Sequence, residues 1–203
     1  LVHWVEAGAP RGEGADLLAE NSQSWPIWAM GEPDVIIDIP TEDVPASGVV
    51  DYEYKMVTNP LDKDVWVKAA EIIPGDRSVL HHVITSFGEL EAEGRRAGRL
   101  KRGTGGGLGG YVPGAKGKPF PDDTGIFLPA GATIEFQMHY TPAGLATTDS
   151  SRMGLYLHEE PPEYKLDNMV LLNPRILIPA GAPNHSEVMA VSYTHLRAHE
   201  TEA

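Results

Sequence analysis

Alternation of polar and apolar residues with a period of two is the sequence feature that most limits how this chain can fold. The pattern is clearest between residues 48 and 58, where Val50, Tyr52, Tyr54 and Met56 alternate with charged residues. Successive side chains of a β-strand point to opposite faces of a sheet. The pattern therefore predicts a strand with one buried face, the face that carries the apolar residues.

Similar alternation predicts strands along most of the chain, with Pro and Gly residues between them. Gly and Pro together supply 39 of the 203 residues, which is above the usual share of about an eighth and below the share of about a quarter that is typical of disordered chains. About eight strands in a chain of this length favour an all-β fold, an antiparallel jelly-roll β sandwich. The further strands are expected at Val35–Ile39, Val65–Ile73, Val79–Phe87, Thr133–Thr141, Met153–His158, Met169–Leu172, Ile176–Ile178 and Glu187–Val191.

The composition excludes several kinds of function. The formal net charge of −13 disfavours nucleic acid and anionic membranes as partners, because both bind cationic surfaces. The chain contains no Cys, so any metal must be held by His, carboxylate or Met side chains. No apolar run approaches the roughly 18 residues of a membrane span, and no signal peptide is visible.

The two ends of the sequence differ from its centre. Residues 1–24 contain a short helical turn closed by Gly8 and Pro10, followed by a polar stretch, and we interpret them as the tail of an upstream domain plus a linker. Residues 192–203 abandon the alternation and resemble translated adapter sequence, so we interpret them as a non-native tail. For this reason His195 and His199, although spaced for a helical metal site, are not expected to bind a metal.

A basic segment interrupts the strands between residues 89 and 121. Seven of the 16 cations lie between Arg95 and Lys118 with no acid among them. A long loop inside a compact domain is usually functional or disordered. We weigh two interpretations, a solvated flexible loop and an electrostatic approach for a small anion to a nearby site.

Three histidines lie inside predicted strands. His81 and His82 are adjacent in an apolar run, and His139 lies on a second strand. Burying an imidazole costs free energy unless it is hydrogen-bonded or bound to a metal. Neutral imidazole is the commonest metal ligand in proteins, and three of them with an open position suit copper, zinc or non-haem iron.

A shared site for the three rings needs a departure from regular strand geometry. Adjacent residues of a strand point to opposite faces, so His81 and His82 can converge only at a bulge, a sharp twist or the end of the strand. On the second strand, His139 lies on the polar face together with Glu135 and Gln137. Convergence of the three rings is therefore the structural test of a metal site.

Two alternatives stay open on the residues alone. The chain can be a non-catalytic jelly-roll binding module in which the histidines are structural. It can also carry a three-His zinc site, which as a hydrolase needs a general base nearby. Glu135 is the strand residue on the His139 face that could supply this base.

The two histidine motifs together resemble the copper type II ascorbate-dependent monooxygenases, the family of the peptidylglycine α-hydroxylating and dopamine β-monooxygenases. The motifs are Val79-Leu-His-His-Val and Phe136-Gln-Met-His-Tyr-Thr-Pro142, and the resemblance extends over residues 25–191. It is closest to bacterial members in which the monooxygenase region follows a c-type cytochrome domain. Shorter matches lie in Gly31–Asp34, Asp64–Glu71, Pro74–Gly75, Tyr111–Gly114, Ile126–Gly131 and Ser151–Leu155.

The resemblance implies an arrangement of domains and one copper site. Residues 25–172 would form the N-terminal copper domain, residues 173–191 the truncated start of a second β sandwich, and residues 1–24 the end of a cytochrome c-like domain. His81, His82 and His139 would bind the electron-transfer copper.

The resemblance does not imply copper binding by the other histidines and methionines of the chain. The second copper belongs to the missing domain, so His185 and Met189 are not expected to be ligands. Met153 and His158 are expected to pack or to face solvent. Gln137 and Tyr140 are candidates for orienting the imidazole rings.

The resemblance also implies a reaction for the intact parent protein. The parent would hydroxylate a C–H bond of a small-molecule or peptide substrate with O₂, with ascorbate as the reductant. A separate hypothesis, from the charge of the basic loop, is that this loop attracts the anionic reductant. The fragment is expected to bind copper without catalysing this reaction, so no catalytic residue is assigned in it. The family's location implies a periplasmic or secreted protein.

Overall fold

The computed structural model describes residues 1–14, 26–101, 105–168, 173 and 175–188. The chain divides into two compact units, Leu1–Asp167 and Asn168–Ala203. The described residues of the first unit form a short helix, α1, followed by eleven strands. The elements are α1 (Val2–Glu6), β1 (Val35–Asp38), β2 (Glu42–Val44), β3 (Glu53–Thr58), β4 (Val65–Ile73), β5 (Leu80–Gly88), β6 (Gly110–Tyr111), β7 (Thr124–Leu128), β8 (Thr133–Tyr140), β9 (Thr147–Asp149), β10 (Arg152–Leu157) and β11 (Tyr164–Lys165).

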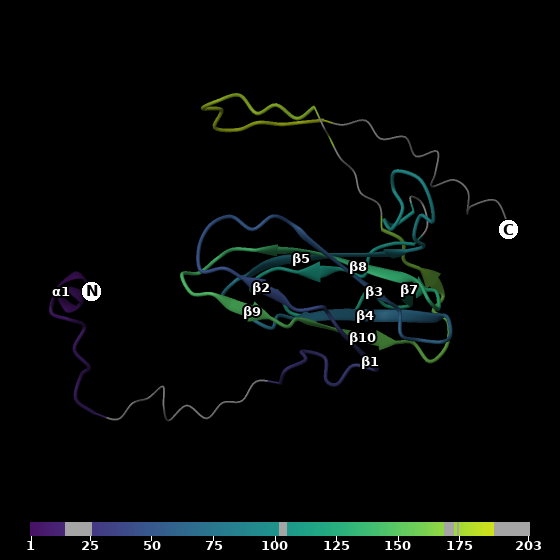
Figure 1. Ribbon diagram of the computed structural model, residues 1–203, viewed down its shortest axis with the longest axis horizontal. Helices are drawn as coiled ribbons and strands as arrows, with labels where there is room; N and C mark the ends of the chain where they lie inside the picture. The colour runs from purple at the N-terminus through teal and green to yellow at the C-terminus, as the bar shows by residue number, and fades with distance from the viewer. Residues whose placement is uncertain (15–25, 102–104, 169–172, 174, 189–203) are drawn as a thin grey trace. The chain divides into compact units, whose positions relative to one another are not determined.

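The strands form two main sheets that lie as two layers (Figure 1). One sheet has the order β1-β10-β4-β7-β11 and the other the order β3-β8-β5-β6, while β2 and β9 form a separate pair. The pairing is antiparallel except between β11 and β7, which run parallel. The predicted all-β sandwich is therefore confirmed, and its jelly-roll connectivity stays a prediction.

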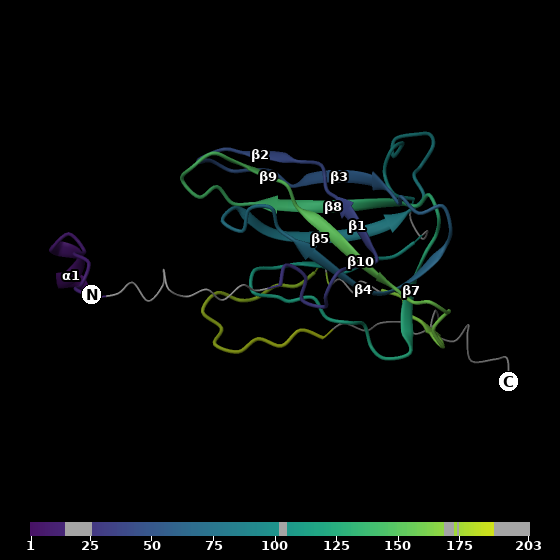
Figure 2. The ribbon, with the colours of Figure 1, turned by 90° about the horizontal axis from the view of Figure 1, so that it is seen from below.

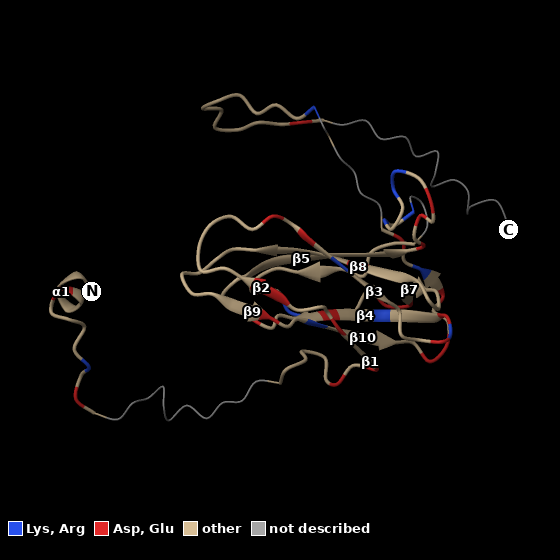
Figure 3. Cartoon of the chain, in the orientation of Figure 1, with Lys and Arg blue, Asp and Glu red and all other residues tan. Residues whose placement is uncertain are grey.

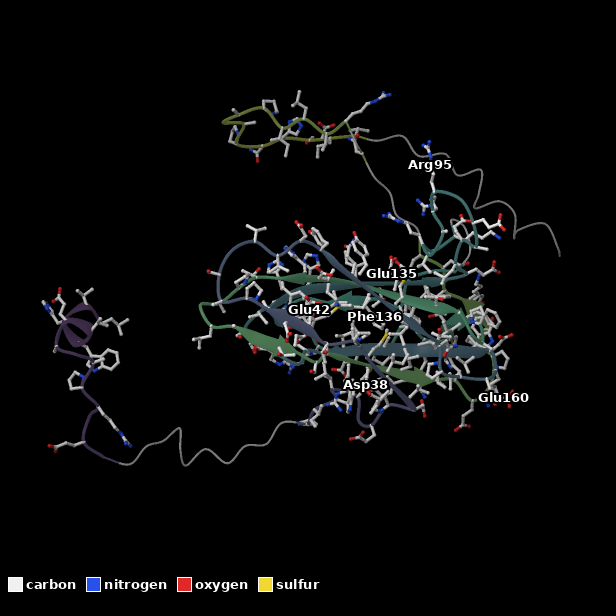
Figure 4. The ribbon with its side chains drawn as sticks, viewed as in Figure 1. Asp38, Glu42, Arg95, Glu135, Phe136 and Glu160 are labelled. Atoms are coloured by element: carbon white, nitrogen blue, oxygen red, sulfur yellow. The ribbon has the colours of Figure 1, made fainter. Side chains whose placement is uncertain are left out.

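The core lies between the two layers. On β8 the predicted alternation is confirmed, because Ile134, Phe136, Met138 and Tyr140 are all buried. Figure 4 shows Phe136 between the layers and Glu135 on the outer side of its sheet. The opposite sheet contributes Ile37, Val67, Leu128, Met153 and Leu155 to the same cluster.

The faces of β3 are the reverse of the prediction. Glu53, Lys55 and Val57 pair with the inward-facing residues of β8, and the side chain of Tyr54 is 53% exposed on the outer face. Lys55 forms an ion pair with Glu42 of β2, which lies beside β3 at the margin of the sandwich (Figure 2). The pairing with β8 sets which face turns inward, and the ion pair allows charged side chains to lie there.

Several predicted elements differ from the structure. Strands β2, β6, β7, β9 and β11 were not predicted, and each has at most five residues, too few for a clear period of two. The strand expected at Ile176–Ile178 is wrong, because these residues have no regular structure and Leu177 donates its N–H to the Glu187 carboxylate. The strand predicted at Met169–Leu172 lies outside the described residues, and Glu187–Val191 is described only at Glu187 and Val188, which are irregular.

The predicted helical turn near the start of the chain is confirmed as α1. The Gly8 N–H donates to the carbonyl of Val5, and Gly8 has a φ of 82°, a conformation that favours glycine at a helix end. In the described part of the chain no helix is long and apolar enough to cross a membrane. The assignments of residues 1–24, 173–191 and 192–203 to neighbouring domains or to a foreign tail stay predictions.

The basic segment is more ordered than a simple loop. Residues 89–101 fold back as a hairpin, in which Leu90 and Leu100 form an antiparallel bridge and the Glu91 N–H donates to the Arg99 carbonyl. Figure 3 shows Lys and Arg residues gathered on this hairpin, with acidic residues on its other arm. Arg102 lies outside the described residues.

Candidate metal centre

The three predicted histidines lie on the outer face of the four-stranded sheet, at one end of β5. His139 is on the central strand β8, and His82 is directly opposite it on β5. Tyr52 lies just before β3 on the other side of His139, because the next residue, Glu53, pairs with Met138. Tyr52, His139 and His82 thus form one row across three neighbouring strands.

A β-bulge brings His81 to the same side as His82. Leu80 pairs with Tyr140 and His82 pairs with His139, so His81 is an extra residue on β5 with no partner on β8. If His81 is left out, Leu80 faces inward, His82 outward and Val83 inward, which is a regular alternation. The bulge that the adjacent histidines required is therefore confirmed.

The ring nitrogens converge. The Nδ1 atoms of His81 and His82 are 3.0 Å apart, and those of His139 and His82 are 3.3 Å apart. One nitrogen from each of the three rings lies within 4.8 Å of the others. Nitrogens that share one ion at about 2.0–2.1 Å are about 2.9–4.2 Å apart for angles between 90° and 180°. The separations of 3.0 and 3.3 Å from His82 to the other two rings lie in this range.

Hydrogen bonds among the histidines cannot satisfy all three rings. The Nδ1 atom of a neutral imidazole carries either one hydrogen or one lone pair. His82 Nδ1 lies within hydrogen-bonding distance of two other Nδ1 atoms, and it can form one such bond. A cation that accepts one lone pair from each ring satisfies all three, so the chemistry of this donor set fits a metal.

The electrostatics of the cluster favour a neutral His82 ring. Burial lowers the pKa of His82 below the usual value for histidine, and the neighbouring His139 and His81 lower it further. Neutral imidazole is the form that binds metals. His82 and His139 are half-buried and His81 is exposed, so the site is open to solvent on the His81 side.

Tyr52 was not predicted as part of the site. Its ring stacks on the His139 ring with the centroids 4.6 Å apart and the planes at 29°, and it lies 5.8 Å from the His82 ring. The three histidine rings instead meet each other edge-on, at 65° to 75°. The sequence carried a usable signal, since Tyr52 belongs to the alternating aromatic face, but that face was expected to be buried.

A hydrogen-bonded turn holds the start of β5. Asp149, which is 1% exposed, accepts hydrogen bonds from the Asp76 N–H, the Ser151 hydroxyl and the Tyr140 hydroxyl. The Asp76 carbonyl accepts the N–H of Leu80. Hydrogen bonds from Ser78 lower the pKa of the Asp76 carboxyl, and burial together with Asp149 raises the pKa of Tyr140. This network anchors the residue next to the bulge.

The two residues expected to orient the imidazole rings form side-chain hydrogen bonds with other partners. Gln137 donates to the Tyr54 hydroxyl, and Tyr140 donates to Asp149. Glu135 is four residues from His139 along β8, a distance of about 13 Å. Glu135 therefore cannot be the general base of a zinc hydrolase at this cluster.

Met153, His158 and His185, which the structure describes, lie outside the cluster. Met153 is buried in the core, and His158 Nε2 forms a hydrogen bond with the carbonyl of Thr124. His185 lies in the second unit, where its ring contacts Glu187. Met189, His195 and His199 lie outside the described residues.

The basic hairpin and the three histidines are at opposite ends of strand β5. It follows Gly88 at the end of β5, whereas His82 is near the beginning of that strand. The six intervening steps span about 20 Å, more than the Debye length of about 8 Å at physiological ionic strength. Along β5 the hairpin thus begins farther from these histidines than one Debye length, and its role as an electrostatic approach for a small anion stays a prediction.

Comparison with known proteins leaves the family unassigned. No protein-family model matches the chain, and no curated protein matches it significantly.

Proposed function

We propose that the chain binds one copper ion through His81, His82 and His139 and acts as the electron-transfer domain of an ascorbate-dependent copper monooxygenase. The observation that carries the proposal is the bulge at His81, which places two adjacent histidines on the same side as His139. A bulge is one of the few strand geometries that let two adjacent histidines face the same side, and bulges are over-represented next to functional sites. The resemblance of both histidine motifs to this monooxygenase family points to the same set of ligands.

The donor set suits copper. The cluster consists of three imidazoles without thiolate or carboxylate. When bound, copper supplies one-electron redox chemistry between Cu(II) and Cu(I). The chain holds three imidazole nitrogens in place around the ion. It also leaves the site open to solvent on the side of the exposed His81. A small reductant such as ascorbate can reach this side.

The hydroxylation itself is proposed for a longer parent protein. In the described part of the chain no second group of three or more His, Cys, Asp or Glu residues is placed to hold a metal. The O₂-dependent hydroxylation of an organic substrate, a second copper, the upstream cytochrome c-like domain and a periplasmic or secreted location rest on the resemblance. We accordingly assign copper binding and copper reduction to this chain, and no catalytic residue.

Copper titration of the purified chain tests the proposal. We expect about one Cu(II) per chain with an EPR spectrum of nitrogen ligation, and loss of the signal when ascorbate is added. His81→Ala and His139→Ala should each weaken copper binding by more than about 100-fold, since each removes a direct ligand. His158→Ala is the matched control, because it changes a partly buried histidine that lies outside the cluster.

Two results would contradict the proposal. One is a wild-type chain that binds no copper above the level of the His81→Ala variant. The other is a strong preference for Zn²⁺ over both copper oxidation states in competition, which would instead support the three-His zinc interpretation.

A further inference from the structure

We propose that Tyr52 is a positioning residue of the metal centre, whose ring holds the His139 imidazole in its ligating orientation and favours Cu(II) over Cu(I). The inference rests on the proposed function, because it concerns the copper-bound chain. It adds a residue outside the histidine cluster to the groups that set the properties of the site.

The contact between Tyr52 and His139 is face to face. The ring centroids are 4.6 Å apart and the planes are inclined by 29°. An imidazole on a strand can rotate about its bond to Cβ, and that rotation moves Nδ1 away from the other two nitrogens. A flat aromatic ring packed against one face restricts the rotation, because turning the imidazole would drive its edge into the phenol.

Tyr52 is also placed to influence the charge state of the ion. A metal-bound imidazole carries part of the charge of the ion, and it carries more of that charge with Cu(II) than with Cu(I). The face of a phenol ring attracts positive charge. Stacking on His139 therefore stabilises the oxidised site more than the reduced site, and removal of the ring should raise the reduction potential.

The next row of the same sheet provides a matched control. Tyr54 lies beside Gln137 as Tyr52 lies beside His139, and Ile84 pairs with Gln137 as His82 pairs with His139. The two tyrosines have similar exposure, 48% for Tyr52 and 53% for Tyr54. Among the described residues the Tyr54 ring stacks on no histidine, and its hydroxyl accepts a hydrogen bond from Gln137. A general effect of removing an exposed tyrosine from this face would appear at both positions.

The experiment compares Tyr52→Leu, Tyr52→Phe and Tyr54→Leu in the full chain, with Cu(II) as the probe. We expect Tyr52→Leu to raise the Cu(II) dissociation constant by about two- to tenfold, the range that one aromatic pair contributes. It should also change the copper hyperfine splitting in EPR and raise the Cu(II)/Cu(I) midpoint potential. Tyr52→Phe keeps the ring and should match the wild type in all three measurements, as should Tyr54→Leu.

The outcomes separate this inference from the proposed function. A wild-type chain that binds no copper overturns both. A wild-type chain that binds copper, with Tyr52→Leu unchanged in affinity, EPR spectrum and potential, overturns only the role of Tyr52. An equal effect of Tyr54→Leu, or an equal loss in Tyr52→Phe, also overturns it. Circular dichroism establishes folding of each variant, and Tyr52→Met replaces Tyr52→Leu if the leucine variant does not fold.

Discussion

At the scale of single residues, His82 has the most constrained position in the cluster. Its Nδ1 atom is the one that approaches both other histidines, at 3.0 and 3.3 Å. Burial and the two neighbouring imidazoles lower its pKa. The same features that keep His82 ready to bind a metal make its protonation unfavourable in the folded, metal-free chain.

The lowered pKa of His82 predicts a pH dependence of stability. Between the usual histidine pKa of about 6.5 and the lower pKa of the folded state, the unfolded chain binds more protons than the folded chain. The folded state should therefore lose stability as the pH falls through this window. Thermal unfolding of the metal-free chain between pH 7.5 and pH 5 measures this loss.

The His82→Gln variant isolates the contribution of this ring. It removes the titrating group, so its melting temperature should depend less on pH than that of the wild type. His3→Gln, which changes an exposed histidine of α1, is the control for the loss of a histidine outside the cluster. Identical pH profiles for the wild type and His82→Gln would contradict this account.

At the scale of secondary-structure elements, the bulge on β5 places His81 on the same side of the sheet as His82 and His139. The bulge leaves His81 without a partner on β8. The pairing of β5 with β8 continues in register on both sides of it. We therefore expect the fold to be independent of His81, whereas the proposed metal site depends on it.

Deletion of His81 tests this separation. The remaining chain keeps Leu80 opposite Tyr140 and His82 opposite His139, so the ladder becomes regular. We expect the deletion variant to fold with a melting temperature at or above that of the wild type and to bind copper as weakly as His81→Ala. A deletion variant that fails to fold would show that the bulge is part of the fold itself.

The hydrogen bonds of the turn before the bulge predict that Asp149→Ala strongly destabilises the fold. Replacement of this buried carboxylate by Ala leaves three hydrogen-bond donors without their acceptor. We expect a loss of about 2–4 kcal/mol in the free energy of unfolding, measured by urea denaturation.

A control for Asp149 lies on the neighbouring strand. Asp43 of β2 also accepts a hydroxyl hydrogen bond, from Thr148, but it is exposed. Asp43→Ala should change the free energy of unfolding by no more than about 0.5 kcal/mol. Equal effects of the two variants would contradict the assigned role of burial.

At the scale of the whole molecule, the charge is distributed unevenly. The chain has a net charge of −13, yet the hairpin of residues 89–101 carries the exposed Arg95, Arg96 and Arg99. Figure 3 shows Lys and Arg residues gathered on this hairpin. The three-histidine cluster thus lies at the beginning of β5, and the cationic hairpin follows its end.

This separation predicts how the hairpin affects copper reduction. Replacement of Arg95, Arg96 and Arg99 together by Gln should leave the rate at which ascorbate reduces the bound copper within about twofold of the wild type at physiological ionic strength. Stopped-flow loss of the Cu(II) absorption measures this rate. A large decrease that salt abolishes would restore the idea that the hairpin attracts the anionic reductant.

Periodicity predicted the long strands because their inward faces need a continuous apolar surface. On β8 the alternation of Ile134, Phe136 and Met138 with polar residues identified both the strand and its buried face. The apolar run at Ile176–Ile178 has the same local signal, but in the second unit no described strand pairs with it. Short strands such as β2 and β9 have too few residues for periodicity and exist because they pair with each other.

By itself the sequence determined the all-β class, the long strands, the three histidines and the condition under which they could share an ion. Each of these follows from residue types and their spacing along one segment. Only the tertiary structure decided that the bulge exists, that the aromatic face of β3 turns outward and that Tyr52 stacks on His139. These depend on the register between strands far apart in the chain, and a shift of one residue in that register exchanges the two faces of a strand.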